Sequence, residues 1–195
     1  MLLFITMKTY LNGRLVIFSA FYDDVYCDRI FRKLYNQIKW LDKTYQNADG
    51  SIVHLPRLTA NYGERSYNYS GMVFEPEPWT DVMLELKKDA EILGQETFNA
   101  AVLQLYRDGK DRVNWHSDDD TCVGKNPTIV SISFGETREF WFRAKNGMGN
   151  LLKLTVEKGD VIVMQGTLQH THLHRVPPEN EKKARINITF RNVIH

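Results

Sequence analysis

Polar and apolar residues alternate near the end of the chain, most clearly in RINITFR, residues 185–191. Arg185, Asn187, Thr189 and Arg191 share one side of an extended segment, and the apolar residues between them share the other. A period of two is typical of a strand that faces two different environments. The sequence therefore predicts a strand here, with one polar face that carries two arginines.

Several short β-rich runs precede this segment and are separated by Gly, Asn, Pro or Asp turns. The expected strands are 100–106, 128–134, 138–144, 151–156 and 160–166. Many short strands with tight connections favour an antiparallel sandwich or jelly roll. Residues 1–10 are mostly apolar, and we expect an edge strand or a frayed terminus there.

Two earlier stretches have helical spacing. Asp23 and Asp24 are suited to cap the first helix. Its apolar positions are Ile30, Phe31, Leu34, Ile38 and Leu41. The second helix is predicted to open at Pro78 and to stop at Gly94. Between the helices, residues 54–71 are rich in Tyr, Arg, Asn and Gly, and we expect loops and a recognition ribbon.

These elements predict a mostly β protein with flanking helices, of the α+β class. The expected architecture is a double-stranded β-helix, or jelly roll, braced by the N-terminal helices. We expect one domain over residues 1–195. Within it, residues 1–95 would supply the helices and the recognition ribbon, and residues 96–195 the jelly-roll core.

Composition adds few constraints. The hydrophobic fraction of 43% suits an ordinary globular protein, and the net charge of +1 neither demands nor excludes a nucleic-acid partner. Cys27 and Cys122 lie far apart, which favours a reduced protein inside the cell, in the cytoplasm or the nucleus. No targeting signal is evident, and no stretch is long enough to span a membrane.

Histidines and a carboxylate suggest a metal site. VNWHSDDD places His116 two residues before Asp118, and LQHTHLH offers His170, His172 and His174. Two imidazoles and one carboxylate form the facial triad that binds non-haem Fe(II) and leaves open positions. Zinc accepts the same residue types, so they leave the metal open. The alternative to a metal site is a purely structural role, in which the acids belong to a solvated loop and the histidines are half-buried in a sheet.

The arginines of residues 185–191 suggest an anionic ligand. A guanidinium binds a carboxylate through two parallel hydrogen bonds, which Lys does less well. Beside a metal with open positions, such an arginine fits a small dicarboxylic acid, and 2-oxoglutarate meets that description. The alternative is a structural ladder of ion pairs with acids such as Glu136, Glu139 or Asp160.

Taken together, the HxD motif, the distal His followed by RVP, and RxNxTFR resemble the AlkB family of Fe(II)/2-oxoglutarate dioxygenases. The resemblance is closest to the eukaryotic-type nucleic-acid demethylases. It extends upstream through PRLTANYGERSYNYSG and GQETFNAAVLQLYRDGKDRVNWHSDDD, and so covers residues from about 55 to the end. It implies that His116, Asp118 and His174 are the iron ligands, whereas His170 and His172 are structural or line the pocket.

The resemblance also implies a co-substrate site and a reaction. The residues matched to 2-oxoglutarate binding are Tyr106, Arg185, Asn187, Thr189, Arg191 and, more weakly, Gln104. Gln104 stands where the family usually has Asn. The implied reaction, with O2 as the second co-substrate, removes N-alkyl groups from bases such as 1-methyladenine and 3-methylcytosine in DNA or RNA. It releases formaldehyde, succinate and CO2, and serves the repair of alkylation damage.

The alkylated base is cationic, so its pocket should offer aromatic faces and a carboxylate. Tyr67 and Tyr69 match the residues that stack on the extruded base. Asp119 and Asp120 would meet its exocyclic amine; the family often has Glu at position 120. The cations expected to contact the nucleic-acid backbone are Arg57, Arg65, Arg107, Lys110, Arg112 and Lys145.

One further observation favours single-stranded DNA or RNA as the expected substrate. Duplex-acting relatives insert an aromatic wedge before the PR segment, and this chain has no aromatic residue between Tyr45 and Tyr62. We expect a monomer. Two alternatives are a related oxygenase acting on protein or small molecules, and a metal-bearing binding module without turnover. The tyrosine and aspartate pairs count against the first alternative, and the metal triad beside a double-arginine strand counts against the second.

Overall fold

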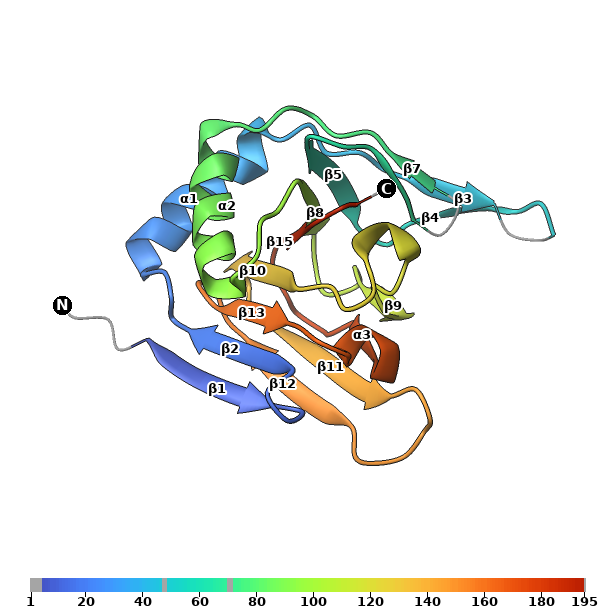
Figure 1. Ribbon diagram of the computed structural model, residues 1–195. Coiled ribbons are helices and arrows are strands. Elements are labelled where there is room, and N and C mark those ends of the chain that lie inside the picture. Colours follow the sequence, from blue (N-terminus) through green and yellow to red (C-terminus); the bar gives the residue numbers. More distant parts are fainter. Residues whose placement is uncertain (1–4, 47–48, 70–71, 195) are drawn as a thin grey trace.

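The computed structural model describes residues 5–46, 49–69 and 72–194, and its body is built from two antiparallel sheets (Figure 1). The order of the seven-stranded sheet is β1 (Thr6–Tyr10), β2 (Leu15–Ser19), β13 (Val161–Met164), β10 (Ile129–Gly135), β15 (Arg185–Arg191), β8 (Ala100–Tyr106) and β5 (Leu58–Gly63). The order of the four-stranded sheet is β12 (Leu152–Val156), β11 (Arg138–Ala144), β14 (His172–Val176) and β9 (Val113–His116). Apolar residues of both sheets share one core cluster, as expected for the predicted jelly roll.

Two helices, α1 (Asp24–Gln37) and α2 (Asp81–Gly94), cover the outer face of the larger sheet (Figure 1). The Asp23 side chain caps α1 as predicted, but the helix ends before Ile38 and does not reach Leu41. Helix α2 begins three residues later than the predicted Pro78, because the Thr80 hydroxyl caps it by accepting a hydrogen bond from the amide of Met83. Among the described residues, neither these helices nor any other is long and apolar enough to cross a membrane.

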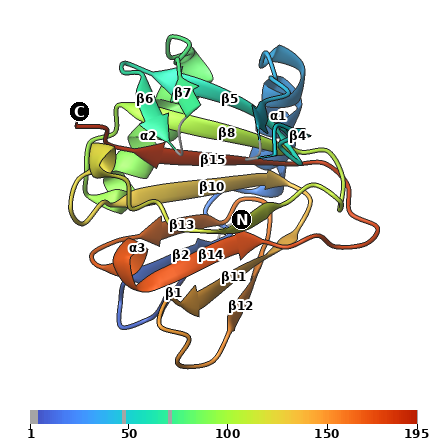
Figure 2. The same cartoon turned by 90° about the vertical axis from the view of Figure 1, so that its right-hand side faces the viewer.

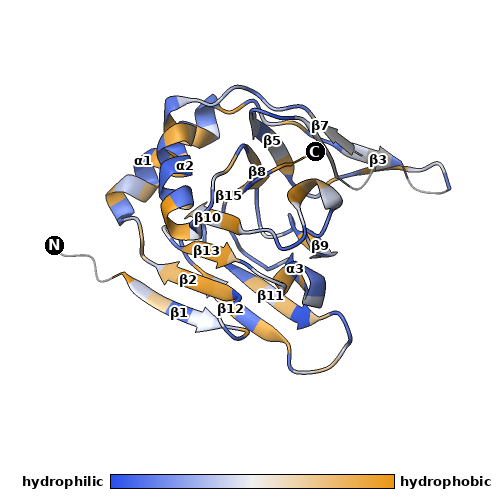
Figure 3. Ribbon diagram, in the orientation of Figure 1, coloured by the Kyte–Doolittle hydropathy of each residue, from blue (hydrophilic) through white to orange (hydrophobic). Residues whose placement is uncertain are grey.

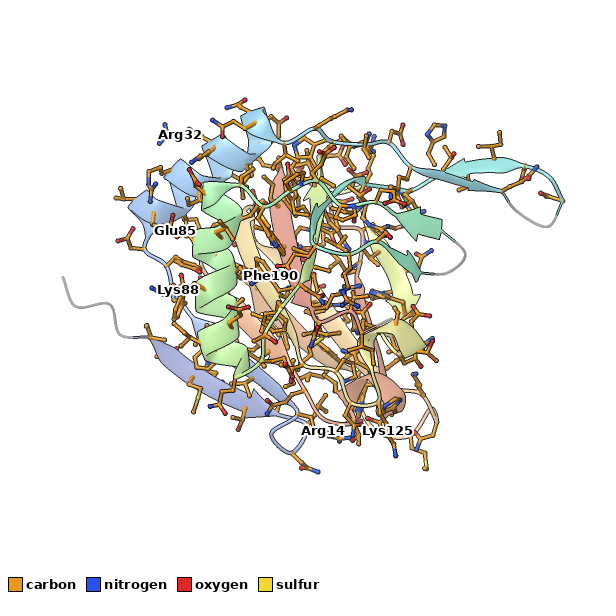
Figure 4. All side chains as sticks on the ribbon, turned by 45° about the horizontal axis from the view of Figure 1, so that its top comes forward. Arg14, Arg32, Glu85, Lys88, Lys125 and Phe190 are labelled. Carbon is orange, nitrogen blue, oxygen red and sulfur yellow. The ribbon has the colours of Figure 1, made fainter. Side chains whose placement is uncertain are left out.

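Strand β15 lies in the middle of the larger sheet and pairs with β10 on one side and β8 on the other (Figure 2). Its apolar residues Ile186, Ile188 and Phe190 are fully buried in the core cluster beneath the helices. Phe190 lies close to α2 in Figure 4, and its ring packs against the rings of Trp79 and Phe98. This packing directs the polar side of β15 into the space between the two sheets.

Two strands of the larger sheet come from segments for which no core strand was predicted. Residues 54–71 were expected to form loops and a ribbon, yet β5 within them pairs along its whole length with β8. Strand β2 joins β13 to the edge strand β1. The sheet therefore draws on residues before position 95 as well as after it.

The expected ribbon is also present, as paired strands β6 (Tyr67–Tyr69) and β7 (Met72–Phe74). A second ribbon, β3 (Thr44–Gln46) with β4 (Ile52–His54), lies near it at the upper right of Figure 1. Two short helical segments lie in the connections between strands. The first, η1 (Thr121–Val123), joins β9 to β10, and the second, α3 (Leu168–Thr171), joins β13 to β14.

The space between the sheets has an apolar part and a polar part. Side chains of β2, β13 and the four-stranded sheet form the apolar part, and Figure 3 shows β2, β10 and β13 as largely hydrophobic. Toward β10, β15 and β8 the facing side chains become polar, including buried Ser131, Ser133, Asn187 and Thr189. The polar part is where the predicted site residues meet.

Arg138 on β11 fastens the loops beside this polar region. Its guanidinium is fully buried and donates to the backbone carbonyls of Asp108, Asp111 and Pro177, at 3.2, 2.9 and 2.6 Å. It also forms an ion pair of 2.9 Å with Glu179. One side chain thereby joins the β8–β9 loop to the β14–β15 loop.

Replacing this side chain should destabilise the fold. We expect Arg138→Met to lower the free energy of unfolding by about 3 kcal/mol or more, because three carbonyls and a carboxylate lose their buried donor. Arg143→Met on the same strand is the control: Arg143 is exposed, and its loss should cost less than about 1 kcal/mol. Urea denaturation measures both values, and equal losses would contradict the role given to Arg138.

Candidate active site

Three side chains from two strands and a loop converge between the sheets. His116 ends β9, Asp118 follows in the next loop, and His174 lies on β14 directly opposite His116. One ligand atom from each of the three lies within 4.8 Å of the other two. The Nε2 atom of His174 is 4.0 Å from Oδ2 of Asp118, and these residue types would hold a divalent metal ion.

A β-bulge makes this convergence possible. His174 pairs with His116 and Val176 with Val113, so two residues of β9 lie between these pairs where β14 has one. The extra residue reverses the alternation along β9, which lets both Val113 and His116 face the interior. Sequence periodicity alone would have put these two side chains on opposite faces.

Neighbouring groups orient two of the three ligands. The Nδ1–H of His116 donates to the carbonyl of Asn114 at 2.9 Å, which leaves Nε2 free for a metal. The backbone N–H of Asp118 donates to the side chain of buried Gln169 at 3.0 Å. Neither Asn114 nor Gln169 was predicted. The Gln169 contact depends on how distant segments pack, whereas the Asn114 contact spans only two residues of β9.

The electrostatics of the trio favour metal binding. Burial alone would raise the pKa of the Asp118 carboxyl, but the Arg191 guanidinium, 3.6 Å away, and the two imidazoles outweigh burial and lower it. Burial and the neighbouring His116 lower the pKa of His174 to about 3. At neutral pH the site therefore offers an ionised carboxylate and a neutral imidazole, which are the protonation states that bind a metal.

A cavity of about 220 Å³ adjoins the trio. It is lined by His116, Asp118, His174 and all six residues matched to the co-substrate site: Gln104, Tyr106, Arg185, Asn187, Thr189 and Arg191. Strands β8 and β15 are paired, so their inward side chains form one polar wall. Ser131 on β10 extends that wall and accepts a hydrogen bond from Asn187 at 2.7 Å.

The two arginines occupy opposite ends of this wall. Arg191 lies beside Asp118, whereas Arg185 lies six residues away and donates to the Ser133 hydroxyl at 2.9 Å. The Nε and Nη1 atoms of Arg185 are buried without a hydrogen-bond partner in the described part of the chain. Burial lowers the pKa of Arg185. A buried guanidinium with unused donors fits a carboxylate ligand.

The alternative of a structural ion-pair ladder does not hold for the described residues. Glu136 pairs with Lys182, Glu139 accepts a hydrogen bond from Trp141, and Asp160 accepts from backbone amides. None of these acids forms an ion pair with Arg185 or Arg191. The donor set and the orphaned guanidinium together fit Fe(II) and a dicarboxylic acid.

Gln104, the departure from the family pattern, contacts Tyr106 directly. The Tyr106 hydroxyl donates to Oε1 of Gln104 at 2.6 Å. Both side chains line the cavity. Because the hydroxyl has a single proton, any other acceptor in the cavity would have to displace this contact.

The residues expected to recognise the base are only partly described. Tyr67 and Tyr69 lie on β6, but their side chains are outside the described part of the structure. Asp119 binds Lys145 at 2.7 Å and Ser117 at 3.0 Å, and it does not line the cavity. Asp120 does not line the cavity either; burial and its acidic neighbours raise its pKa.

The cations expected to contact the backbone are scattered. Arg57 lines the cavity, whereas Arg107 is held by Asp111 at 2.8 Å and Lys145 by Asp119. Arg65, Lys110 and Arg112 are exposed.

The two extra histidines lie near the trio but do not join it. His170 belongs to α3 and contacts the carbonyl of Lys125, and His172 hydrogen-bonds to Thr171 at 2.8 Å. Ser131 and Ser133, which line the wall or support it, were not predicted. Their alternation in TIVSISF, residues 128–134, was a usable signal once that strand was paired with residues 185–191.

Comparisons with known proteins agree with this geometry. The family model described as the 2OG-Fe(II) oxygenase superfamily matches residues 14–191. The alpha-ketoglutarate-dependent dioxygenase alkB homolog 3 proteins of Bos taurus and Homo sapiens are each 38% identical over 93% of this chain. The chain spans 66% of the length of those relatives.

Two further similarities extend the comparison. The DNA oxidative demethylase ALKBH2 of Mus musculus is 30% identical, over 91% of this chain and 79% of its own length. The solved structure of OsALKBH1 superposes with a TM-score of 0.69 at 18% identity, over 96% of this chain and 100% of that one, and supports the jelly-roll fold. The chain therefore belongs to the AlkB family of the 2OG-Fe(II) oxygenase superfamily.

Proposed function

We propose that this protein is an Fe(II)/2-oxoglutarate-dependent dioxygenase that demethylates N-alkylated bases, such as 1-methyladenine and 3-methylcytosine, in DNA or RNA. The products are the restored base, formaldehyde, succinate and CO2, and the role is repair of alkylation damage. The protein acts as a monomer and as a single domain over residues 1–195. A reducing compartment, cytoplasmic or nuclear, is supported by Cys27 and Cys122, which form no disulfide with each other.

The observation that carries this proposal is the shared cavity. His116, Asp118 and His174 line one part of it, and Arg185, with two buried donors unused, lines another. A pure metal-binding module has no need for a buried cation aimed at the same space. A dicarboxylic acid satisfies both features at once, because one end reaches the metal position and the other reaches the guanidinium.

In this proposal, His116, Asp118 and His174 hold Fe(II), and Arg185 holds the distal carboxylate of 2-oxoglutarate. When bound, Fe(II) with 2-oxoglutarate and O2 supplies the oxidation of the N-alkyl carbon. Arg191 keeps the Asp118 carboxylate ionised, and Asn114 keeps the His116 ring in the tautomer that binds a metal. Asn187 and Thr189 hydrogen-bond to each other at 3.1 Å and so stiffen the wall between the arginines.

The substrate assignment rests on the recognition ribbon and on the relatives. Among these relatives are proteins named as DNA oxidative demethylases. Tyr67 and Tyr69 would stack on an extruded cationic base, and the His116 ring would form the opposite wall. Asp120 is the acid we assign to the exocyclic amine, because Asp119 is already bound by Lys145.

A preference for single strands is part of the same proposal. Base extrusion costs least where the base is already unpaired. The segment before Pro56 carries no aromatic residue after Tyr45 that would serve as a wedge in a duplex.

The proposal predicts turnover on methylated oligonucleotides. The protein, incubated with Fe(II), ascorbate and 2-oxoglutarate, should release succinate and remove one methyl group from 1-methyladenine or 3-methylcytosine. Mass spectrometry of single-stranded and double-stranded substrates checks this, and the single strand should react faster. Succinate formed only with protein or small-molecule substrates, or no succinate at all, would overturn the assignment.

Loss of the carboxylate ligand should abolish metal binding. We expect Asp118→Ala to weaken binding of Mn²⁺, used as a stand-in for Fe²⁺, at least about 100-fold. Asp119→Ala is the matched control and should change the affinity by only a few-fold, because Asp119 pairs with Lys145. Electron paramagnetic resonance titration measures free Mn²⁺. Wild-type affinity in Asp118→Ala would remove Asp118 from the ligand set.

Loss of the buried Arg185 guanidinium should weaken the binding of 2-oxoglutarate. We expect Arg185→Gln to raise the KM for 2-oxoglutarate about 30-fold or more, since a buried charge pair is lost. Ser133→Ala removes only the hydroxyl next to Arg185 and should raise this KM a few-fold at most. Steady-state succinate formation gives both values. An unchanged KM in Arg185→Gln would assign the co-substrate to another cation.

A further inference from the structure

The outer face of the four-stranded sheet carries a row of alternating cations and tryptophans. Trp141 on β11 lies opposite Lys153 on β12 and Arg175 on β14. The Lys153 ammonium is 4.3 Å and the Arg175 guanidinium 4.2 Å from the centre of the Trp141 ring. Arg175 also lies 4.8 Å from the Trp115 ring, and Arg143 covers that ring at 4.4 Å. We call these five residues the cation–tryptophan row.

The row adjoins the cavity at Trp115. Strands β9 and β5 are the edges of the two sheets, and residues of both line the cavity. The bulge in β9 directs His116 inward and gives Trp115 contact with the cations of the outer face. Trp115 lines the cavity as well. A ligand that leaves the cavity over β9 therefore meets the row next.

The cations of the row have no anionic partner. Within the described residues, the side chains of Arg143, Lys153 and Arg175 take part in no hydrogen bond or ion pair, and the Nε atom of Arg175 is buried without an acceptor. Nearby cations elsewhere are paired, as Lys145 is with Asp119. The carboxylate of Glu139 on the same face accepts a hydrogen bond from the Trp141 indole. The row therefore carries a local excess of positive charge.

The geometry of the row selects the kind of ligand. A guanidinium stacked on an indole keeps its N–H edge available for phosphate oxygens, and the stacking holds it in a fixed orientation. The contacted tryptophan faces are taken by cations, so the row offers charge rather than a platform for bases. Four strands span about 15 Å, which is long enough for more than one phosphate of an extended strand.

We propose that the cation–tryptophan row binds the sugar–phosphate backbone of the nucleic-acid strand whose base enters the cavity. This inference rests on the proposed function for the identity of the ligand. The row consists of residues other than the scattered cations expected from the sequence, and it is continuous with the site. It predicts affinity that is independent of sequence and sensitive to salt.

The test is the salt dependence of binding to an unmodified, fluorescein-labelled single-stranded oligonucleotide. We expect Arg143→Gln/Lys153→Gln to weaken binding about tenfold, and to reduce the slope of log K against log salt concentration by about 1.4, for two lost phosphate contacts. Both side chains are exposed, so the fold should persist. The charge-preserving Arg143→Lys/Lys153→Arg should keep the wild-type slope.

The matched control is Arg29→Gln/Lys88→Gln on the helices. Arg29 is likewise stacked on an aromatic ring, at 4.9 Å from Tyr26, and Lys88 projects from α2 on the other side of the molecule (Figure 4). This variant loses the same charge and should keep the wild-type slope. An equal fall in slope for both double variants would mean that only the net charge of the protein matters, and this would contradict the proposal. An unchanged slope in the row variant would also overturn it.

Two further measurements separate this inference from the proposed function. Turnover of a methylated trinucleotide, too short to reach along the row, should be unchanged in the row variant. If no methylated base is turned over but the salt dependence of oligonucleotide binding still falls in the row variant, the proposed demethylase function is wrong. The proposal that the row binds the nucleic-acid backbone is then still supported. If the row variant loses binding to polyglutamate but not to the oligonucleotide, the row serves an acidic protein and our proposal is wrong.

Discussion

The structure depends on strand β15 being buried on both faces, with opposite chemistry on each. Ile186, Ile188 and Phe190 pack beneath the helices, and the polar side chains between them face the second sheet. The apolar contacts fix the strand's orientation, because a shift of one residue would expose polar groups to the core and apolar groups to the cavity. Two guanidiniums are thereby held in the interior, where a cation without a partner is costly.

Two of the interior charges, on Arg191 and Asp118, stabilise each other. Arg191 lies beside Asp118, and this proximity keeps the carboxylate ionised despite its burial. His174 remains neutral because burial opposes its protonation. Arg185, at the far end of the same strand, retains unused donors. The apolar packing of β15 thus places Arg191 beside the histidine–aspartate trio and Arg185 elsewhere in the same cavity.

The two faces of the four-stranded sheet carry different side-chain chemistry. Its inner face supplies His174 and the phenylalanines that pack against it, and its outer face supplies the row of cations and indoles. The bulge in β9 connects the faces, since it turns His116 inward and Trp115 toward the outer cations. The AlkB family membership accounts for the inner face. The outer face follows from packing and charge in this chain.

The sequence by itself determined the features that depend on local order. The alternation in residues 185–191 predicted the central strand, and Asp23 and Gly94 marked one end of each helix. Motif spacing pointed to His116 and Asp118, and the family resemblance then selected His174 from three histidines.

Tertiary structure decided everything that depends on which segments become neighbours. Strand β5 pairs with β8 although its segment resembles a loop, and Asp119 turns to Lys145, which lies on a distant strand connection. The proton of the Tyr106 hydroxyl goes to Gln104, and the bulge reverses the faces of β9. The physical reason is that periodicity and capping are local properties of the chain. Strand register, ion pairing and burial are set only when segments far apart in sequence pack together.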